Sequence, residues 1–305
     1  MTLSRKDLTT EKQNPVSHKI DSRSAYEIIE IMNNQDATIA DKVKDVLPEI
    51  SRVVDMAVTA IKNGHHVFYV GAGTSGRLGV LDASEVPPTY SAPRNWFQGI
   101  IAGGREALER SIEGAEDHPE DAIRDLKEFG VEKGDLVIGI ASSGATPYVV
   151  SALKYGISIH AGTAYLICNP TPLIPVDADV VIAVDVGPEI VTGSTRMKSG
   201  TATKMVLNMI STAAMIRIGK VYSNLMVDLQ VVNNKLQDRG SRIIAKMTGL
   251  SYETAGDALN QSGGSVKTAV VMTMKKVNRK EAKELLDSYN GNLRGVIGDI
   301  DDTLL

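Results

Sequence analysis

The stretch HVFYVGAGTSG, residues 66–76, joins a short apolar run to a glycine-rich loop. Further short apolar runs follow it, and each is bounded by turn residues; together the runs are residues 66–70, 95–102, 135–141, 163–169 and 179–185. Segments with helical character lie between most of them, at residues 75–84, 104–112, 117–128 and 147–159. Continuous apolar strands that alternate with helices indicate a parallel sheet buried on both faces. The pattern therefore predicts an α/β fold with a doubly wound, mostly parallel sheet and helices on both faces.

The rest of the chain predicts helices on either side of this sheet domain. Residues 1–50 form an N-terminal arm and helices: the first 20 residues read as extended, a short helix capped by Asp21 or Ser22 follows, and apolar residues recur at helical spacing over 37–63. The sheet domain is expected at residues 51–222. Beyond it, residues 223–305 contain no strand-like run and predict a small all-α domain of four short helices, with helix starts at Ser251 and at Asn278.

Composition excludes several classes of function. The net charge is −4 and the pI about 5.8, whereas general binders of nucleic acid or anionic membranes are usually basic. Cys168 is the only cysteine, so the chain has neither an internal disulfide nor a cysteine metal cluster. No apolar run approaches the ~18–20 residues of a membrane span, and the N-terminus lacks an apolar signal core. We therefore expect a cytoplasmic protein that binds neither nucleic acid nor a membrane.

The glycine-rich loop contains the spacing G-x-G-x-x-G at Gly71, Gly73 and Gly76, which often marks a dinucleotide site. That fold needs an acidic residue at the end of its second strand to hold the ribose. Here the second strand ends in IIAGG, residues 100–104, without an acid. A P-loop would need Gly-Lys-Ser/Thr, which is also missing. The context therefore argues against a nucleotide cofactor.

A second loop resembles the first: DLVIGIASSGATPYVV, residues 135–150, is again a strand, a small hydroxyl-rich turn and a helix. Two such loops at the carboxyl ends of parallel strands can converge on one ligand. Helix N-termini and hydroxyl groups favour an anion, so we expect a phosphate monoester on a small polar body. Tight strand–helix turns without a ligand remain the alternative. The candidate binding residues are Gly73, Thr74, Ser75, Gly76, Ser142, Ser143, Gly144 and Thr146.

A third polar segment, GPEIVTGSTRMKSGTATK at residues 187–204, leads into an apolar helix. Lys198 at a helix start opposes the helix dipole, which an anionic ligand would offset; a solvated surface is the simpler interpretation. Ser194 joins the candidate binding residues. Glu189 is a candidate acid–base or substrate-orienting group.

These motifs together resemble a known family. VGAGTSGRLG (70–79) and GIASSGATPYV (139–149) resemble the phosphosugar-binding loops of the SIS (sugar isomerase) domain. Residues 187–204 resemble the signature shared by bacterial N-acetylmuramic acid 6-phosphate etherases and the glucokinase regulatory protein. LDASEVPPTY (81–90) and EGAEDHPEDA (113–122) resemble the two active-site segments of the etherases. The resemblance covers essentially the whole chain.

The resemblance implies a homodimeric lyase that needs no metal and no redox cofactor. It implies that N-acetylmuramic acid 6-phosphate is cleaved to D-lactate and N-acetylglucosamine 6-phosphate in cell-wall amino-sugar recycling. By the same resemblance Glu85 donates a proton to the departing lactyl oxygen, while Glu116 removes the C2 proton and activates water. Glu113 and Asp117 flank Glu116 in sequence, and the two catalytic roles could be exchanged.

Other functions of the same domain stay open at this point. A non-catalytic sugar-phosphate sensor, like the regulatory protein, would not need the pair Glu85 and Glu116. An SIS transcription regulator would carry a basic recognition helix, for which only KKVNRK (275–280) is a candidate. An aldose–ketose isomerase is a lesser alternative.

Overall fold

The computed structural model describes residues 4–229, 231 and 233–300. These residues form two compact units, one of residues 4–84 and 95–212 and the other of residues 85–94 and 213–300. Two helices, α4 (Gly73–Tyr90) and α7 (Lys198–Arg217), carry the chain from the first unit into the second. The boundaries expected at residues 50 and 222 stay a prediction.

The first unit contains a parallel sheet of five strands. These are β1 (Val67–Gly71), β2 (Phe97–Ile101), β3 (Leu136–Ile140), β4 (Gly162–Ile167) and β5 (Val180–Ala183). Their order is β2-β1-β3-β4-β5, and each neighbouring pair is parallel. Every apolar run expected to be a strand overlaps one of them, which confirms the predicted α/β class.

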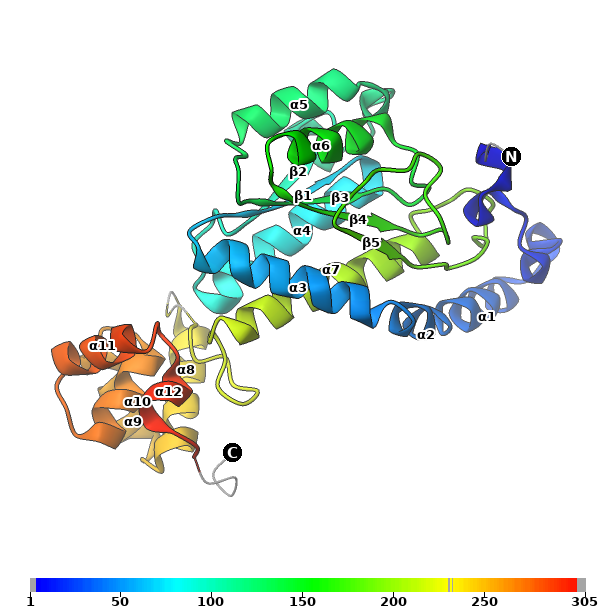
Figure 1. Cartoon of the computed structure of the whole chain (residues 1–305). Coiled ribbons are helices and arrows are strands. Elements are labelled where there is room, and N and C mark those ends of the chain that lie inside the picture. The colour runs from blue at the N-terminus through cyan, green and yellow to red at the C-terminus, as the bar shows by residue number, and fades with distance from the viewer. Residues whose placement is uncertain (1–3, 230, 232, 301–305) are drawn as a thin grey trace. The chain divides into compact units, whose positions relative to one another are not determined.

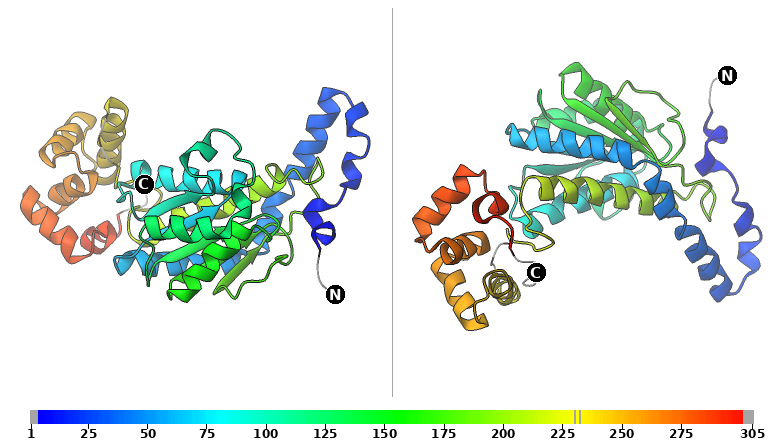
Figure 2. Two further views of the ribbon diagram at one scale, coloured as in Figure 1. Left: turned by 90° about the horizontal axis from the view of Figure 1, so that it is seen from above. Right: turned by 60° about the horizontal axis from the view of Figure 1, so that its bottom comes forward.

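Helices cover both faces of this sheet. Figure 1 shows α5 (Pro119–Glu128) and α6 (Pro147–Ser158) on one side, and α3 (Leu47–Lys62), α4 and α7 on the other; Figure 2 shows the same layers. Phe68 of β1 packs in a core cluster with Leu126 of α5 and Leu153 of α6. The next residue, Tyr69, points to the opposite face and donates a hydrogen bond to Asp82 of α4 (3.0 Å). Alternate residues of β1 are therefore buried by different helix layers, as expected for a doubly wound sheet.

The N-terminal region differs from the expectation. Instead of an extended arm, residues 5–22 form four 3-10 turns: η1 (Arg5–Asp7), η2 (Thr9–Glu11), η3 (Pro15–Ser17) and η4 (Ile20–Ser22). Helix α1 (Ala25–Asp36) is capped by Ser24 with Glu27 in a capping box, so the cap predicted at Asp21 or Ser22 was wrong.

The long helix expected over residues 37–63 is broken into α2 (Ile39–Lys44) and α3. Pro48 lies in the first turn of α3. Proline has no N–H to continue a helix that precedes it, but its fixed φ suits a new helix start. Helical periodicity is similar on both sides of the break, so it did not predict the interruption.

Two further expectations need correction. A helix was expected over residues 75–84, but α4 continues through Pro87 and Pro88 and ends at Tyr90. The φ of proline is compatible with a helix, so the cost is confined to the missing N–H groups and local crowding. The helix expected at 104–112 is only a 3-10 turn, η5 (Arg105–Leu108), followed by η6 (Ala115–Asp117).

The second unit is helical throughout its described elements beyond residue 233. It contains α8 (Asn234–Thr248), α9 (Tyr252–Gln261), α10 (Val266–Lys275), α11 (Arg279–Ser288) and the short α12 (Leu293–Ile297). The first four were predicted, as were the cap at Ser251 and the capping box of Asn278 with Glu281. Their apolar faces surround Val270 of α10, which is fully buried.

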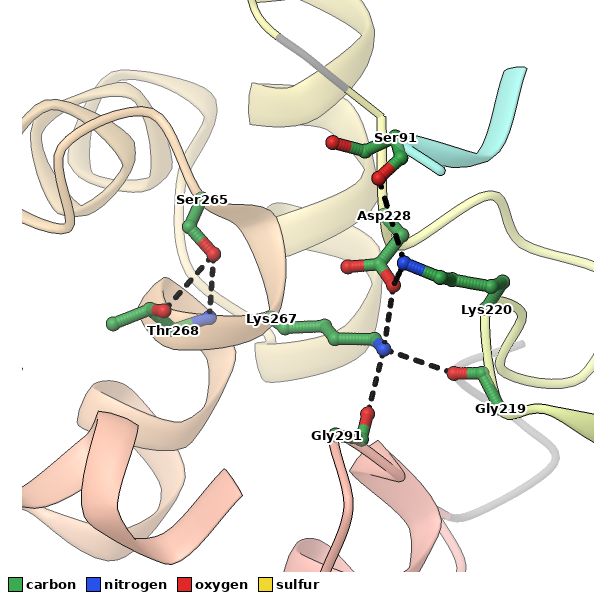
Figure 3. Close-up of polar contacts among 8 residues, drawn as sticks. All are labelled: Ser91, Gly219, Lys220, Asp228, Ser265, Lys267, Thr268 and Gly291. Carbon is green, nitrogen blue, oxygen red and sulfur yellow. Dashed lines mark hydrogen bonds and ion pairs between the residues drawn. The ribbon is translucent and has the colours of Figure 1, made fainter. Parts of the chain in front are cut away.

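A buried lysine connects distant segments of this unit. Figure 3 shows Lys267 of α10, whose Nζ donates to the Gly219 carbonyl (2.9 Å), the Gly291 carbonyl (2.6 Å) and Asp228 Oδ2 (2.8 Å). Asp228 also pairs with Lys220 Nζ at 3.2 Å. Burial lowers the pKa of Lys267, against the opposing charge of Asp228. All three ammonium protons have acceptors, so Lys267 ties residues before α8 and after α11 to α10.

Within the part of the chain described, no helix combines the length and apolar character needed to cross a membrane.

Candidate active site

The strand order places a crevice at the carboxyl ends of β1 and β3. These strands are neighbours, but β1 continues to β2 on one side and β3 continues to β4 on the other. Ligands of open α/β sheets bind where the strand order reverses in this way. A pocket of about 260 Å³ lies there, and its lining comes from five segments of the first unit: Arg5, Leu8, Glu11, Ala72, Gly73, Thr74, Ser75, Glu116, Ile140, Ala141, Ser142, Ser143, Ala145, Thr146, Gly193 and Thr195.

The first glycine-rich loop supplies Gly73, Thr74 and Ser75 to this pocket, at the first turn of α4. Gly76 does not line it. A Cβ on Gly76 would lie 2.7 Å from the Gly71 carbonyl oxygen and 2.6 Å from Ile101 Cγ1. The glycine spacing therefore allows α4 to pack closely on β1 and β2, which explains G-x-G-x-x-G without a dinucleotide.

The second loop supplies Ser142, Ser143 and Thr146, and α6 begins directly after Thr146. Gly144 turns the chain with φ of +64°, and a Cβ there would meet Pro172 Cα at 2.6 Å. Gly144 thus shapes the loop without lining the pocket. The first N–H groups of α4 and α6 have no partner within their helices, so the two helix starts and the hydroxyls together form a site suited to an anion.

The third segment contributes Gly193 and Thr195, while Ser194 between them is not part of the lining. Gly200 of α7 lies close to the first loop, because a Cβ there would contact Thr74 Cγ2 at 3.6 Å. The structure thus brings together the three segments that the sequence singled out.

Glu189 is not among the residues that line the pocket, and it caps α7. Its side chain is fully buried; Oε2 accepts from the Lys198 N–H (2.9 Å), and Oε1 accepts from the Ser199 N–H (2.9 Å) and Ser199 Oγ (2.8 Å). Lys198 Nζ donates to Gln35 Oε1 and the Pro188 carbonyl, and burial lowers its pKa. The negative charge at the start of α7, which the sequence suggested an anionic ligand would supply, therefore comes from the Glu189 carboxylate.

Glu116 lies on η6 and lines the pocket. It also borders a neighbouring hollow of about 300 Å³, which shares Ala72 and Gly73 with the pocket. Glu113 and Asp117 line that hollow but not the pocket. Of the three clustered acids, Glu116 is thus the one beside both loops.

Glu85 belongs to the second unit and is not among the residues that line the pocket. It is exposed on α4, twelve residues after Gly73. At 1.5 Å of rise per residue, about 18 Å of helix separate it from the α4 start. Of the two candidate catalytic glutamates, the pocket lining therefore contains Glu116 alone.

The N-terminal segment contributes Arg5, Leu8 and Glu11, which sequence reasoning did not assign to the site. A polar segment carries no periodicity that would place it near distant loops, so no sequence signal was available. Among the residues that the structure describes, no group of three or more histidine, cysteine or acidic side chains is placed to hold a metal ion.

Comparisons with known proteins agree with this architecture. The family model described as "Glucokinase regulatory protein N-terminal SIS domain" matches residues 49–157. A phosphoheptose isomerase from Francisella tularensis superposes with a TM-score of 0.50 at 14% identity, over 64% of this chain and 100% of that one, which shows a shared fold.

Relatives named N-acetylmuramic acid 6-phosphate etherase match nearly the whole chain. The protein from Clostridium beijerinckii is 48% identical over 99% of both chains. The protein from Rhodopirellula baltica is 50% identical over 94% of this chain and 95% of its own, and one from Yersinia pestis is 46% identical over 95% and 98%. This chain belongs to the family of N-acetylmuramic acid 6-phosphate etherases, built on an SIS domain.

Proposed function

We propose that the protein is a carbon–oxygen lyase that cleaves the D-lactyl ether of N-acetylmuramic acid 6-phosphate. The observation that carries the proposal is the family membership over the full chain, together with Glu116 on the wall of an anion-type pocket. The products are N-acetylglucosamine 6-phosphate and D-lactate, as in the recycling of cell-wall amino sugars. A lone buried cysteine fits a reducing compartment, so we place the reaction in the cytoplasm.

The chemistry needs a base, an acid and an anchor for the phosphate. In the open-chain aldehyde, the C2 proton is acidified by the C1 carbonyl, and the C3–O bond is beta to that carbonyl. A base takes the C2 proton, the electron pair forms the C2–C3 double bond, and the C3–O pair leaves with a proton from the acid. Water then adds at C3 and a proton returns to C2, which balances the reaction without an oxidant or reductant.

We assign the base to Glu116, because it borders the pocket in which the helix starts and hydroxyls would hold the phosphate. Thr74, Ser75, Ser142, Ser143 and Thr146 would donate to the phosphate oxygens, with Gly73 at the α4 start. Gly76, Gly144, Ser194 and Glu189 would then act indirectly, by shaping the loops and capping α7.

We assign the acid to Glu85, and the length of α4 supports a proton donor that comes from a second copy of the chain. A sugar whose phosphate rests at the α4 start is shorter than the ~18 Å of helix that lead to Glu85 of the same chain. We therefore propose a homodimer in which Glu85 reaches the reacting bond from the second copy. Oligomers of identical chains with two-fold symmetry would build two such sites.

The first test is D-lactate release from N-acetylmuramic acid 6-phosphate by wild type, Glu116→Gln and Glu85→Gln. Glu113→Gln is the matched control, because Glu113 is a neighbouring acid that does not line the pocket. We expect lactate from wild type and the control, and a loss of at least about 100-fold from the two other variants. Equal activity of Glu116→Gln and wild type would refute the assignment of the base.

The shared site has its own test. Inactive Glu85→Gln and Glu116→Gln proteins are mixed under conditions that exchange subunits. A mixed dimer would contain one site with both glutamates intact, so activity should return in the mixture. No recovery despite proven exchange would place both glutamates of one site on one chain.

A folded wild type that binds the sugar phosphate but releases no lactate would instead indicate a sensor. Specific binding of DNA would instead indicate a transcription regulator. Conversion of an aldose phosphate to a ketose phosphate would indicate an isomerase.

A further inference from the structure

The N-terminal segment is fixed to the sheet unit by buried hydrogen bonds. Thr9 Oγ1 donates to Asn169 Oδ1 (2.8 Å), and Asn169 Nδ2 donates to Thr10 Oγ1 (3.1 Å). The Gly193 N–H donates to the Thr10 carbonyl at 3.2 Å, and Thr10 is 0% exposed. Asn169 follows β4, so the segment is anchored where the strands end.

The anchoring continues along the loop between β5 and α7. Asn14 Nδ2 donates to the Pro188 carbonyl (3.1 Å), and Ser17 Oγ donates to the Ile190 carbonyl (2.7 Å). Figure 1 draws this segment in dark blue next to that loop. An arm held at both of these places is part of the sheet unit, and its side chains have defined neighbours.

One consequence is that Arg5, Leu8 and Glu11 form part of the pocket wall. Leu8 is only 4% exposed, so the turn that carries Arg5 is packed against the unit. Thr9 and Thr10, four and five residues along the chain, provide the anchors described above.

Charge gives Arg5 a particular place in this pocket. It is the one lysine or arginine among the lining residues described, while Glu11 and Glu116 contribute two carboxylates. Without Arg5 the charged side chains of the wall would all repel a phosphate. Within the described residues the Arg5 guanidinium forms no ion pair, so its donors remain available to a ligand.

We propose that Arg5 is the positively charged partner of the substrate phosphate. This inference rests on the proposed function, because it assigns a residue to the phosphosugar of that site. A guanidinium offers a planar pair of N–H donors that matches two phosphate oxygens, and such pairs are among the stronger hydrogen bonds in proteins. The helix starts and the hydroxyls would hold the other side of the phosphate.

The substrate has a second anion, the lactyl carboxylate, and the test separates the two. N-acetylglucosamine 6-phosphate carries the phosphate but no lactyl group. If Arg5 binds the phosphate, Arg5→Gln should weaken the binding of both ligands. If Arg5 binds the carboxylate, the variant should weaken only the binding of the lactyl ether.

The experiment compares Arg5→Gln, Arg5→Lys and Lys6→Gln with wild type as full-length proteins. Lys6 is the matched control, because it is the adjacent exposed cation and does not line the pocket. Calorimetry gives the Kd of N-acetylglucosamine 6-phosphate, lactate release gives kcat and KM, and circular dichroism checks the fold.

We expect Arg5→Gln to raise both Kd and KM by about tenfold or more while kcat changes little, because one charge-assisted contact is lost in ground and transition states alike. Arg5→Lys should fall between wild type and Arg5→Gln, and Lys6→Gln should match wild type.

Equal Kd values for wild type and Arg5→Gln would overturn the inference, and so would an effect confined to the lactyl ether. Wild type that releases no lactate would refute the proposed lyase, while the Kd measurement would still test Arg5 as a phosphate partner.

Discussion

Replacing Glu189 with alanine should destabilise the first unit without removing a group that touches substrate. The Glu189 carboxylate is 0% exposed and accepts three hydrogen bonds from the first two residues of α7, at 2.8–2.9 Å. It also lies where the helix dipole favours a negative charge. Alanine would remove the acceptors and leave two buried N–H groups and the Ser199 hydroxyl without partners.

The magnitude follows from these contacts. A hydrogen bond to a charged group contributes about 1.5–3 kcal/mol, and loss of a helix cap costs about 0.5–2 kcal/mol. These terms overlap, because the same atoms are counted in both. We expect Glu189→Ala to lower the free energy of unfolding by about 3–5 kcal/mol. Glu189→Gln keeps one oxygen for Ser199 and loses mainly the bond from Lys198, so about 1–3 kcal/mol is expected.

The assay can report the first unit alone. Trp96 is the only tryptophan of the chain and belongs to that unit, so its fluorescence in a urea titration follows the unfolding of the sheet. Glu30→Ala is the matched control, because Glu30 is exposed on α1. An unfolding midpoint of Glu189→Ala equal to that of Glu30→Ala would refute the capping role. Lost lactate release from a Glu189→Gln protein of unchanged stability would show instead that Glu189 acts on the substrate.

Three further changes have defined outcomes. Burial raises the pKa of Asp82 above its ordinary value of 3.8, so the folded protein binds this proton more tightly than the unfolded chain does. The free energy of unfolding of wild type, compared with that of Asp82→Asn, should therefore fall as the pH rises from 3.8 through the raised pKa. Urea titrations across that pH range measure this difference. A constant difference would contradict this sign. Lys267→Met should lower the free energy of unfolding by about 3–5 kcal/mol, because two carbonyls and Asp228 lose the Lys267 donor. Thermal circular dichroism should then show a transition at lower temperature. An unchanged melting curve would refute the stabilising role of Lys267. Gly76→Ala should cost about 1–3 kcal/mol by Trp96 fluorescence, since its methyl group has no space beside β1 and β2, and wild-type stability would disprove that close contact.

The amino-acid sequence by itself determined the strands, most helices and the family. Five apolar runs bounded by turn residues predict five strands, because a strand buried on both faces is apolar at every position. The capping signals at Ser251 and Asn278 predict where two helices begin, because an N-cap is a local hydrogen bond between residues three apart. The loops at 71–76 and 142–146 carry their hydroxyls and glycines within a few residues, so their anion-binding character is also a local property.

Only the tertiary structure decided which groups meet. Glu189 reads as a candidate acid in sequence, yet folding places it under the first turn of α7, where N–H donors hold it. Arg5 lies in a segment without periodicity and joins the pocket through Thr9 and Thr10, whose partners are about 160 residues away. Glu116 reaches the pocket while Glu85 lies along α4, although both match active-site segments. Hydrophobic periodicity indicates which face of a helix or strand is buried. Contacts between distant segments depend on how the helices pack on the sheet, and a local sequence pattern does not contain that information.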